Sequence, residues 1–124
     1  MDCVFCEIVN DKKDIIFESD LAVAFFDSHP VSVGHTLIIP KRHCVTYFDL
    51  TKEEIEEMFE LSMKVKEHLD QEYQPDGFNV GFNCLEAGGQ SVMHAHMHVI
   101  PRYKGDSENP RGGLRKVVKR KDNY

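Results

Sequence analysis

Three histidines at alternate positions, His94, His96 and His98, constrain the fold of this chain more than any other feature. Side chains alternate between the two faces of a β-strand, so this spacing predicts a strand with the three imidazoles on one face. At a rise of roughly 3.3 Å per residue, neighbouring rings would start about 6.6 Å apart, which lets them share one phosphate-sized ligand. The residues between and around them are apolar: Met93, Ala95, Met97, Val99 and Ile100.

A glycine-rich turn, Gly88-Gly89-Gln90-Ser91, comes just before these histidines and could offer backbone N–H groups and two polar side chains to an anion. Three meanings of the histidine pattern are open. A polar layer in the core is disfavoured, because three adjacent buried imidazoles would each need a hydrogen-bond partner. A three-histidine metal enzyme is chemically reasonable. The turn favours the third meaning, a bound phosphate attacked by an unprotonated imidazole.

The size and composition of the chain limit its class. With 124 residues we expect a single domain over 1–124, with a core at about 3–103 and a polar, basic tail at about 104–124. A formal net charge of −6 disfavours a nucleic-acid partner. Since there is neither an apolar run of about 18 residues nor a signal pattern, we expect a cytoplasmic protein without a membrane partner. We interpret the basic residues of the tail as a solvated terminus.

Hydrophobic patterning predicts several strands and one long helix. Strands are expected at 15–18 and 21–26, joined by a turn at Ser19-Asp20, and again at 35–40 and 78–83. Between residues 49 and 74, Thr51 followed by Glu54 is typical of a helix capping box. The buried stripe of this helix is predicted from apolar residues at i, i+3 and i+4 spacing. Its members are Ile55, Met58, Phe59, Ser62, Val65 and Leu69.

Four cysteines are present, and two of them, Cys3 and Cys6, form a Cys-x-x-Cys pair at the start of the chain. In a chain that we expect to be cytoplasmic, such a pair is more often a metal clip or a redox pair than a structural disulfide. The sequence alone leaves this choice open.

The stretch from Gln90 to Ile100, QSVMHAHMHVI, resembles the histidine-triad signature His-φ-His-φ-His-φ-φ of the HIT superfamily of nucleotide hydrolases and transferases. Phe26-Asp27, the segment GHTLIIPK at 34–41, and Asn83 also match the family in order and spacing, so the resemblance covers about the first hundred residues. It implies an α+β fold with a five-stranded antiparallel sheet, one long helix and short helices. It also implies a homodimer in which two sheets join into one of ten strands.

The resemblance also implies roles for individual residues. His96 would attack the α-phosphorus of a nucleotide and form a covalent nucleotidyl-histidine that water hydrolyses. His98 would hold the phosphoryl oxygens, His35 would support the triad, and Asp27 would accept a hydrogen bond from the ribose. The remaining substrate contacts would come from Phe26, Ser28, Asn83, Gly89, Gln90, Ser91 and Val92, with Ser91 also placed to assist catalysis.

Some bacterial-type relatives hold a structural zinc ion with residues that correspond to Cys3, Cys6, His43 and His94. Two thiolates and two imidazoles make a closed tetrahedral set that suits Zn²⁺ and leaves no position for water. No catalytic metal is then required. The alternatives are an empty thiol pair, or Cys44 or Cys84 entering the site.

The expected substrate is a nucleoside 5′-phosphate derivative such as a phosphoramidate or a nucleotidyl adenylate. The Pro101-Arg102 ending is similar instead to dinucleoside polyphosphate hydrolases, which are the alternative. A second alternative is a nucleotide-binding signalling module with little turnover.

Overall fold

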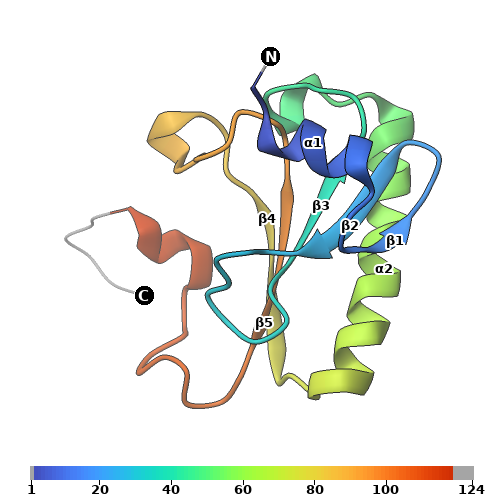
Figure 1. Ribbon diagram of the computed structural model, residues 1–124. Helices are drawn as coiled ribbons and strands as arrows, with labels where there is room; N and C mark the ends of the chain where they lie inside the picture. Colours follow the sequence, from blue (N-terminus) through green and yellow to red (C-terminus); the bar gives the residue numbers. More distant parts are fainter. Residues whose placement is uncertain (1, 119–124) are drawn as a thin grey trace.

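The computed structural model describes residues 2–118 and contains one antiparallel sheet with helices on both of its faces (Figure 1). The five strands lie in the order β1-β2-β3-β5-β4, which confirms the predicted α+β fold. The elements in chain order are α1 (Val4–Asp11), β1 (Ile15–Glu18), β2 (Ala22–Phe26), β3 (Thr36–Pro40), α2 (Lys52–Tyr73), β4 (Gly77–Phe82) and β5 (Met97–Arg102). Three 3-10 helices lie between or after them: η1 (Tyr47–Asp49), η2 (Glu86–Gly88) and η3 (Gly113–Val117).

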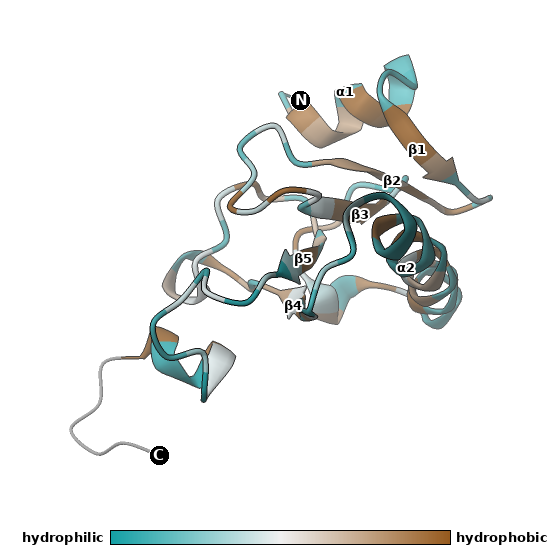
Figure 2. Ribbon diagram, turned by 90° about the horizontal axis from the view of Figure 1, so that it is seen from below, coloured by the Kyte–Doolittle hydropathy of each residue, from teal (hydrophilic) through white to brown (hydrophobic). Residues whose placement is uncertain are grey.

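The two faces of the sheet are covered by different helices. In β2, Ala22 and Ala24 pack into a core cluster with the buried side of α2, while Val23 and Phe25 pack into a second cluster with Phe5 of α1. Figure 2 shows the same division on α2, whose apolar residues turn toward the strands and whose hydrophilic residues face outward. The period-2 alternation of β2 therefore separates a core side from a side that carries α1.

The long helix begins at the predicted capping box. The Thr51 hydroxyl accepts from the Glu54 backbone N–H at 3.1 Å, and the Glu54 carboxylate accepts from the Thr51 N–H at 2.8 Å. The predicted stripe was partly wrong: Ile55 and Phe59 are exposed, and Ser62 is only half-buried. The helix carries two apolar stripes, and the one that meets the sheet consists of Met58, Leu61, Val65 and Leu69.

The predicted hairpin is confirmed, because β1 and β2 pair antiparallel across Ser19-Asp20. The predicted strands at 35–40 and 78–83 are also present as β3 and β4. The helix α1 was not predicted. Its N-cap is Cys3, whose thiol accepts a hydrogen bond from the Cys6 backbone N–H at 3.4 Å.

The histidine strand is shorter than predicted. β5 begins at Met97, so His98 lies on the strand, whereas His94 and His96 lie in the irregular segment before it. The segment does not join the sheet because its backbone bonds to the loop after β3 instead: the Ala95 N–H donates to the Cys44 carbonyl at 2.7 Å.

Of the helices within residues 2–118, none has the length and apolar character needed to cross a bilayer.

Candidate functional site

Three imidazoles line up on the sheet face that also carries α1. His98 comes from β5 and His35 from the residue just before β3, and their ring centroids are 5.2 Å apart. His96 lies on the other side of His98 with a centroid distance of 4.9 Å. His94 turns away toward the two N-terminal cysteines. The sequence had predicted that all three triad rings share one ligand, and this was wrong for His94. The three rings also do not form a three-histidine metal site.

Hydrogen bonds define which ring nitrogens carry protons in the neutral rings. The Val31 N–H donates to His35 Nδ1 at 3.2 Å, so the proton of His35 lies on Nε2. That nitrogen is 3.0 Å from His98 Nδ1, which must accept, so the proton of His98 lies on its own Nε2. This Nε2 is fully enclosed and has no hydrogen-bond partner among the described residues. An enclosed donor without an acceptor is costly, and a ligand oxygen would satisfy it.

His96 has the opposite tautomer. Its Nδ1 donates to the backbone carbonyl of His94 at 2.9 Å, which leaves a lone pair on Nε2. The residue is only 4% exposed, and the edge of the Phe5 ring packs against it at a centroid distance of 5.1 Å. Within residues 2–118, the fully enclosed side-chain atoms that lack a hydrogen-bond partner are Ser32 Oγ and His98 Nε2. The Nε2 of His96 is not one of them. In this tautomer of the neutral ring, His96 thus keeps Nε2 free of a proton.

Burial keeps the rings beside His96 uncharged. It lowers the pKa of His98 to about 4, with further lowering by the neighbouring His96 and His35. Burial also lowers the pKa of His35, although the Asp27 carboxylate, 3.5 Å from His35 Nε2, opposes this shift. At neutral pH both rings act as neutral hydrogen-bonding groups.

Of the substrate contacts predicted at Phe26, Asp27 and Ser28, the structure brings only Asp27 to the histidines. Asp27 reaches His35 with one oxygen and accepts the His29 N–H at 2.9 Å with the other. The exposed Ser28 hydroxyl pairs with the His29 ring at 3.0 Å instead of the triad. Phe26 lies on the α2 face, where its ring is near His68, so the structure does not bring it to the site.

Two aromatic residues that the sequence analysis missed occupy the site face instead. Phe25 packs edge-to-face on Phe5 at a centroid distance of 5.6 Å, and Phe5 contacts His96. The alternation of β2 could have identified Phe25, because Phe25 and Phe26 must point to opposite faces. Phe5 gave no such signal, since α1 has only 8 residues.

The turn before the triad is built around Gln90, which the sequence analysis assigned to the phosphate. This side chain is buried, and its Oε1 accepts from the Leu85 N–H at 2.7 Å. Its Nε2 donates to the carbonyls of Val45 and Val92 at 2.6 and 3.0 Å. The Gln90 side chain therefore orders the turn, and both of its N–H donors are used within the protein, so none is left for a phosphate.

The other residues predicted in the turn remain at the surface or beside the rings. Gly89 has a φ of 91°, a conformation that glycine adopts without strain, and Ser91 is exposed. Val92 packs against the α1-side core cluster. Asn83 lines one cavity together with His35 and His98.

The four predicted metal ligands, Cys3, Cys6, His43 and His94, come together with all their ligand atoms within 4.8 Å of one another. The Cys3 sulfur lies 3.4 Å from His94 Nδ1, and the Cys6 sulfur lies 3.4 Å from His43 Nδ1. Zinc bound tetrahedrally, about 2.3 Å from sulfur and about 2.0 Å from nitrogen, would hold such atoms about 3.5 Å apart. The donor set therefore fits this ion. Cys44 and Cys84 are outside the cluster.

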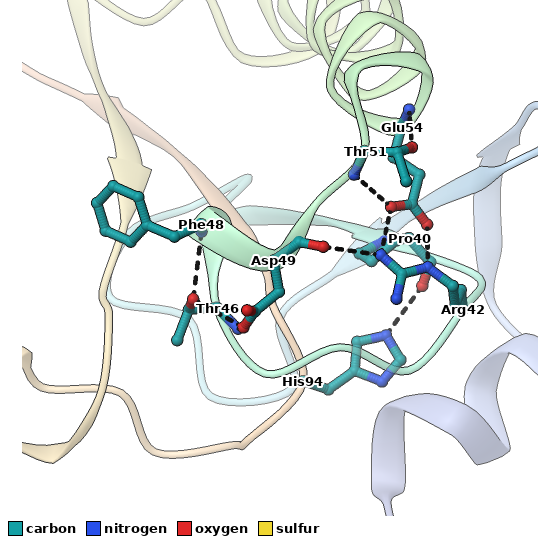
Figure 3. A network of polar contacts seen from close by, with 8 residues as sticks. All are labelled: Pro40, Arg42, Thr46, Phe48, Asp49, Thr51, Glu54 and His94. Atoms are coloured by element: carbon teal, nitrogen blue, oxygen red, sulfur yellow. Dashed lines mark hydrogen bonds and ion pairs between the residues drawn. The ribbon is translucent and has the colours of Figure 1, made fainter.

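A polar network fixes the loop that supplies His43 (Figure 3). His94 Nε2 donates to the Pro40 carbonyl at 2.9 Å, which leaves Nδ1 with its lone pair toward the cysteines. Arg42 makes two hydrogen bonds to the buried Glu54 carboxylate, at 2.8 and 3.0 Å, and a third to the Asp49 carbonyl. Burial alone would raise the pKa of Glu54, but the hydrogen bonds from Arg42 and Thr51 outweigh it and lower that pKa. The N-terminus of α2 thus anchors the loop that carries His43.

Comparison with known proteins identifies the family. The model of the HIT domain matches residues 9–105. The chain belongs to the HIT domain family. This confirms the family that the sequence resemblance had indicated, and the histidine segment with the Gln90 turn before it lies within the matched residues.

Curated HIT relatives differ in how much is known of them. The chain is 40% identical to "Protein hit" of Bacillus subtilis over 109 residues, covering 84% of this chain and 74% of that protein. It is 34% identical to the bis(5′-adenosyl)-triphosphatase of Dictyostelium discoideum, covering 79% and 66%. It is 33% identical to adenylylsulfatase HINT3 of Arabidopsis thaliana, covering 85% and 54%.

Among solved structures, a zinc-bound histidine triad family protein from Mycobacterium smegmatis is similar to this chain. The TM-score is 0.78 at 34% identity, and the match covers 88% of this chain and 81% of that one.

Proposed function

We propose that this HIT protein is a nucleotide hydrolase or transferase that acts on the α-phosphate of nucleoside 5′-phosphate derivatives. The observation that supports it most is the complementary state of two adjacent rings. His96 presents an unprotonated Nε2, and His98, beside it, holds an enclosed N–H without a protein acceptor. A nucleophile beside a hydrogen-bond donor for developing charge is the arrangement that phosphoryl transfer requires.

The reaction has two steps. His96 Nε2 uses its lone pair to form a bond to the α-phosphorus, and the bond between phosphorus and the leaving group breaks. The leaving group takes that electron pair and a proton from solvent, with the Ser91 hydroxyl as a hydrogen-bond donor. Water then attacks the phosphorus, the histidine–phosphorus bond returns its electron pair to Nε2, and the water proton passes to solvent.

Other residues bind and orient the substrate in this proposal. The enclosed His98 N–H donates to a phosphoryl oxygen, which satisfies that nitrogen. His35 holds His98 in the donor tautomer, and Asp27 accepts from the ribose. Asn83 and the backbone N–H of Val92 supply further donors to the phosphate. The Gly89 N–H, which was predicted to help them, already donates to the Glu86 carbonyl at 2.9 Å and therefore has no part in the proposal.

The preferred substrates are nucleoside phosphoramidates and nucleotidyl adenylates. A dinucleoside polyphosphate is the alternative, supported by Pro101-Arg102 and by the triphosphatase relative. A low-turnover signalling module is the second alternative, and an intact, correctly oriented His96 argues against it. Rates on an adenosine phosphoramidate and on diadenosine polyphosphates, measured side by side, discriminate among the three.

Replacing the nucleophile tests the mechanism. His96→Ala is expected to lower kcat on a fluorogenic adenosine phosphoramidate by at least about a thousandfold, because no other group can form the covalent intermediate. His68→Ala, which removes a histidine of α2 on the opposite face, should keep the wild-type rate. Turnover by His96→Ala at the rate of the wild type would refute the assignment.

We also propose that Cys3, Cys6, His43 and His94 hold a structural zinc ion. The distances among their ligand atoms and the zinc-bound relative support this. The ion would tie the N-terminus to the loop after β3 and to the segment before His96. Thiolate ligands persist in a reducing compartment, which is consistent with the proposed cytoplasmic location.

Metal analysis of protein purified without chelators is expected to give about one zinc per chain. Cys6→Ser should retain far less than one and unfold at a lower temperature, because zinc affinity contributes to folding free energy. Cys84→Ser is the matched control and should keep its zinc. A wild-type content far below one per chain would reject the site.

We propose that the chain forms a homodimer. β4 is an edge strand, and Val80 on it is 51% exposed. An exposed stripe on α2, Ile55, Phe59 and Met63, provides further apolar surface. Phe59→Glu should shift the mass measured by sedimentation equilibrium from dimer toward monomer, whereas Lys64→Glu should not. A monomeric wild type would contradict the proposal.

A further inference from the structure

The hydrogen bond between the rings of His35 and His98 can exist in two forms. In the form described above, His35 Nε2 donates to His98 Nδ1 over 3.0 Å, and the proton of His98 lies on Nε2. In the other form both rings carry their proton on Nδ1, so that His98 Nδ1 donates to His35 Nε2 and His98 Nε2 keeps only a lone pair. Since two neutral imidazoles can form this bond in either direction, a group outside the pair must select the form.

The backbone N–H of Val31 makes this selection. It donates to His35 Nδ1 at 3.2 Å, and that nitrogen cannot hold a proton of its own while it accepts. The Asp27 carboxylate also favours a proton on His35 Nε2, but its oxygen lies 3.5 Å away, beyond the usual length of such a bond. In the proposed function this carboxylate is also shared with the ribose. The donor form of His98 therefore depends mainly on the position of one backbone N–H.

The loop that carries Val31, residues 27–35 between β2 and β3, gains little from side-chain packing. The side chains of Val31 and Val33 are 73% and 62% exposed, and both line a cavity of about 430 Å³ beside the loop. The enclosed hydroxyl of Ser32 has no hydrogen-bond partner among residues 2–118. The position of the Val31 N–H must therefore be set by contacts of the loop backbone.

Close contact with α2 fixes the end of the loop next to His35. Gly34 has a φ of 92°, and a Cβ on it would lie 3.0 Å from side-chain atoms of both Leu69 and Tyr73. The Gly34 carbonyl also accepts from the Thr36 hydroxyl at 2.8 Å. These contacts hold the backbone beside His35, but they lie beyond the residues that place the Val31 N–H.

Tyr103 holds the part of the loop nearer to Val31. It follows β5, and its hydroxyl donates to the Val33 carbonyl at 2.7 Å. Burial raises the pKa of Tyr103, and the nearby Tyr73 and Asp76 raise it further, so the hydroxyl keeps its proton at neutral pH. Tyr103 is itself anchored, because its backbone N–H donates to the Asp106 carboxylate at 3.0 Å.

We propose that Tyr103 is a positioning residue, which keeps the Val31 N–H on His35 and thereby keeps the N–H of His98 directed at the substrate phosphate. This inference rests on the function proposed above. Without the bond to Val33 the loop can withdraw its N–H, and the ring pair can pass to the form in which a lone pair of His98 faces the phosphoryl oxygen. That lone pair repels the charge that develops during phosphoryl transfer, so only the donor form turns over.

Removing one hydroxyl tests this role. Tyr103→Phe should lower kcat on a fluorogenic adenosine phosphoramidate by about fivefold, the weight of one neutral hydrogen bond, with a smaller change in KM. Long-range ¹H–¹⁵N correlation NMR at about pH 8 should show part of His98 protonated at Nδ1 in this variant, which a merely structural role would not produce. Val31→Pro should shift His98 further, because proline has no N–H and the replaced side chain is exposed.

Tyr47→Phe is the matched control, because it removes the same hydroxyl from an exposed residue of η1 whose ring packs on Phe48 and Phe82. It should keep the wild-type kcat and leave His98 protonated at Nε2. If His98 also stays protonated at Nε2 alone in Tyr103→Phe and Val31→Pro, this inference is overturned, whether or not kcat falls, while the proposed function stands. A wild-type chain that does not hydrolyse the phosphoramidate overturns the proposed function, and this inference with it.

Discussion

The hydrogen bond from His96 Nδ1 to the backbone carbonyl of His94 is the contact on which the chemistry of this site depends. It joins residues two apart in sequence and fixes both the tautomer and the direction of the ring. The carbonyl is itself held, because the ring of His94 is fixed by Pro40 on one nitrogen and faces the cysteines with the other. Ring orientation by an outer hydrogen bond is the usual way in which proteins set imidazole chemistry.

The loop after β3 allows the short segment before β5 to place His94 beside the cysteines and His96 beside His98. The carbonyls of Cys44 and Val45 in this loop, and that of Pro40 at the end of β3, each accept a hydrogen bond from the segment before β5. One of these bonds comes from the Ala95 backbone and two come from the side chains of Gln90 and His94. Together they hold His94 beside the cysteines, while His96 and His98 stay together. The loop is held in turn by Arg42 and the buried carboxylate of Glu54, so the N-terminus of α2 supports the site from the far face of the sheet. We therefore expect the geometry of the nucleophile to depend on residues that never contact substrate.

Much of this arrangement was accessible from the sequence. Period-2 and helical patterns predicted the β1–β2 hairpin, β3, β4 and α2, because local alternation and capping dictate these elements. The pattern of alternate histidines identified the site, and the spacing of Cys3, Cys6, His43 and His94 suggested their grouping through family resemblance. The outer stripe of α2 was mistaken for part of its buried face, since both stripes are apolar and only the sheet decides which is buried. Phe26 was chosen over Phe25 although the alternation of β2 places the two side chains on opposite faces. Gln90 was assigned to a ligand because the saturation of its N–H donors arises from tertiary contacts, which the sequence does not show.

The most direct test of the central claim is the protonation of individual ring nitrogens, measured by long-range ¹H–¹⁵N correlation NMR at about pH 8, above the ordinary histidine pKa. The account predicts that His96 is protonated at Nδ1 and bare at Nε2, while His35 and His98 are both protonated at Nε2. A spectrum in which His96 carries its proton on Nε2 would leave the site without a nucleophile and would contradict the account.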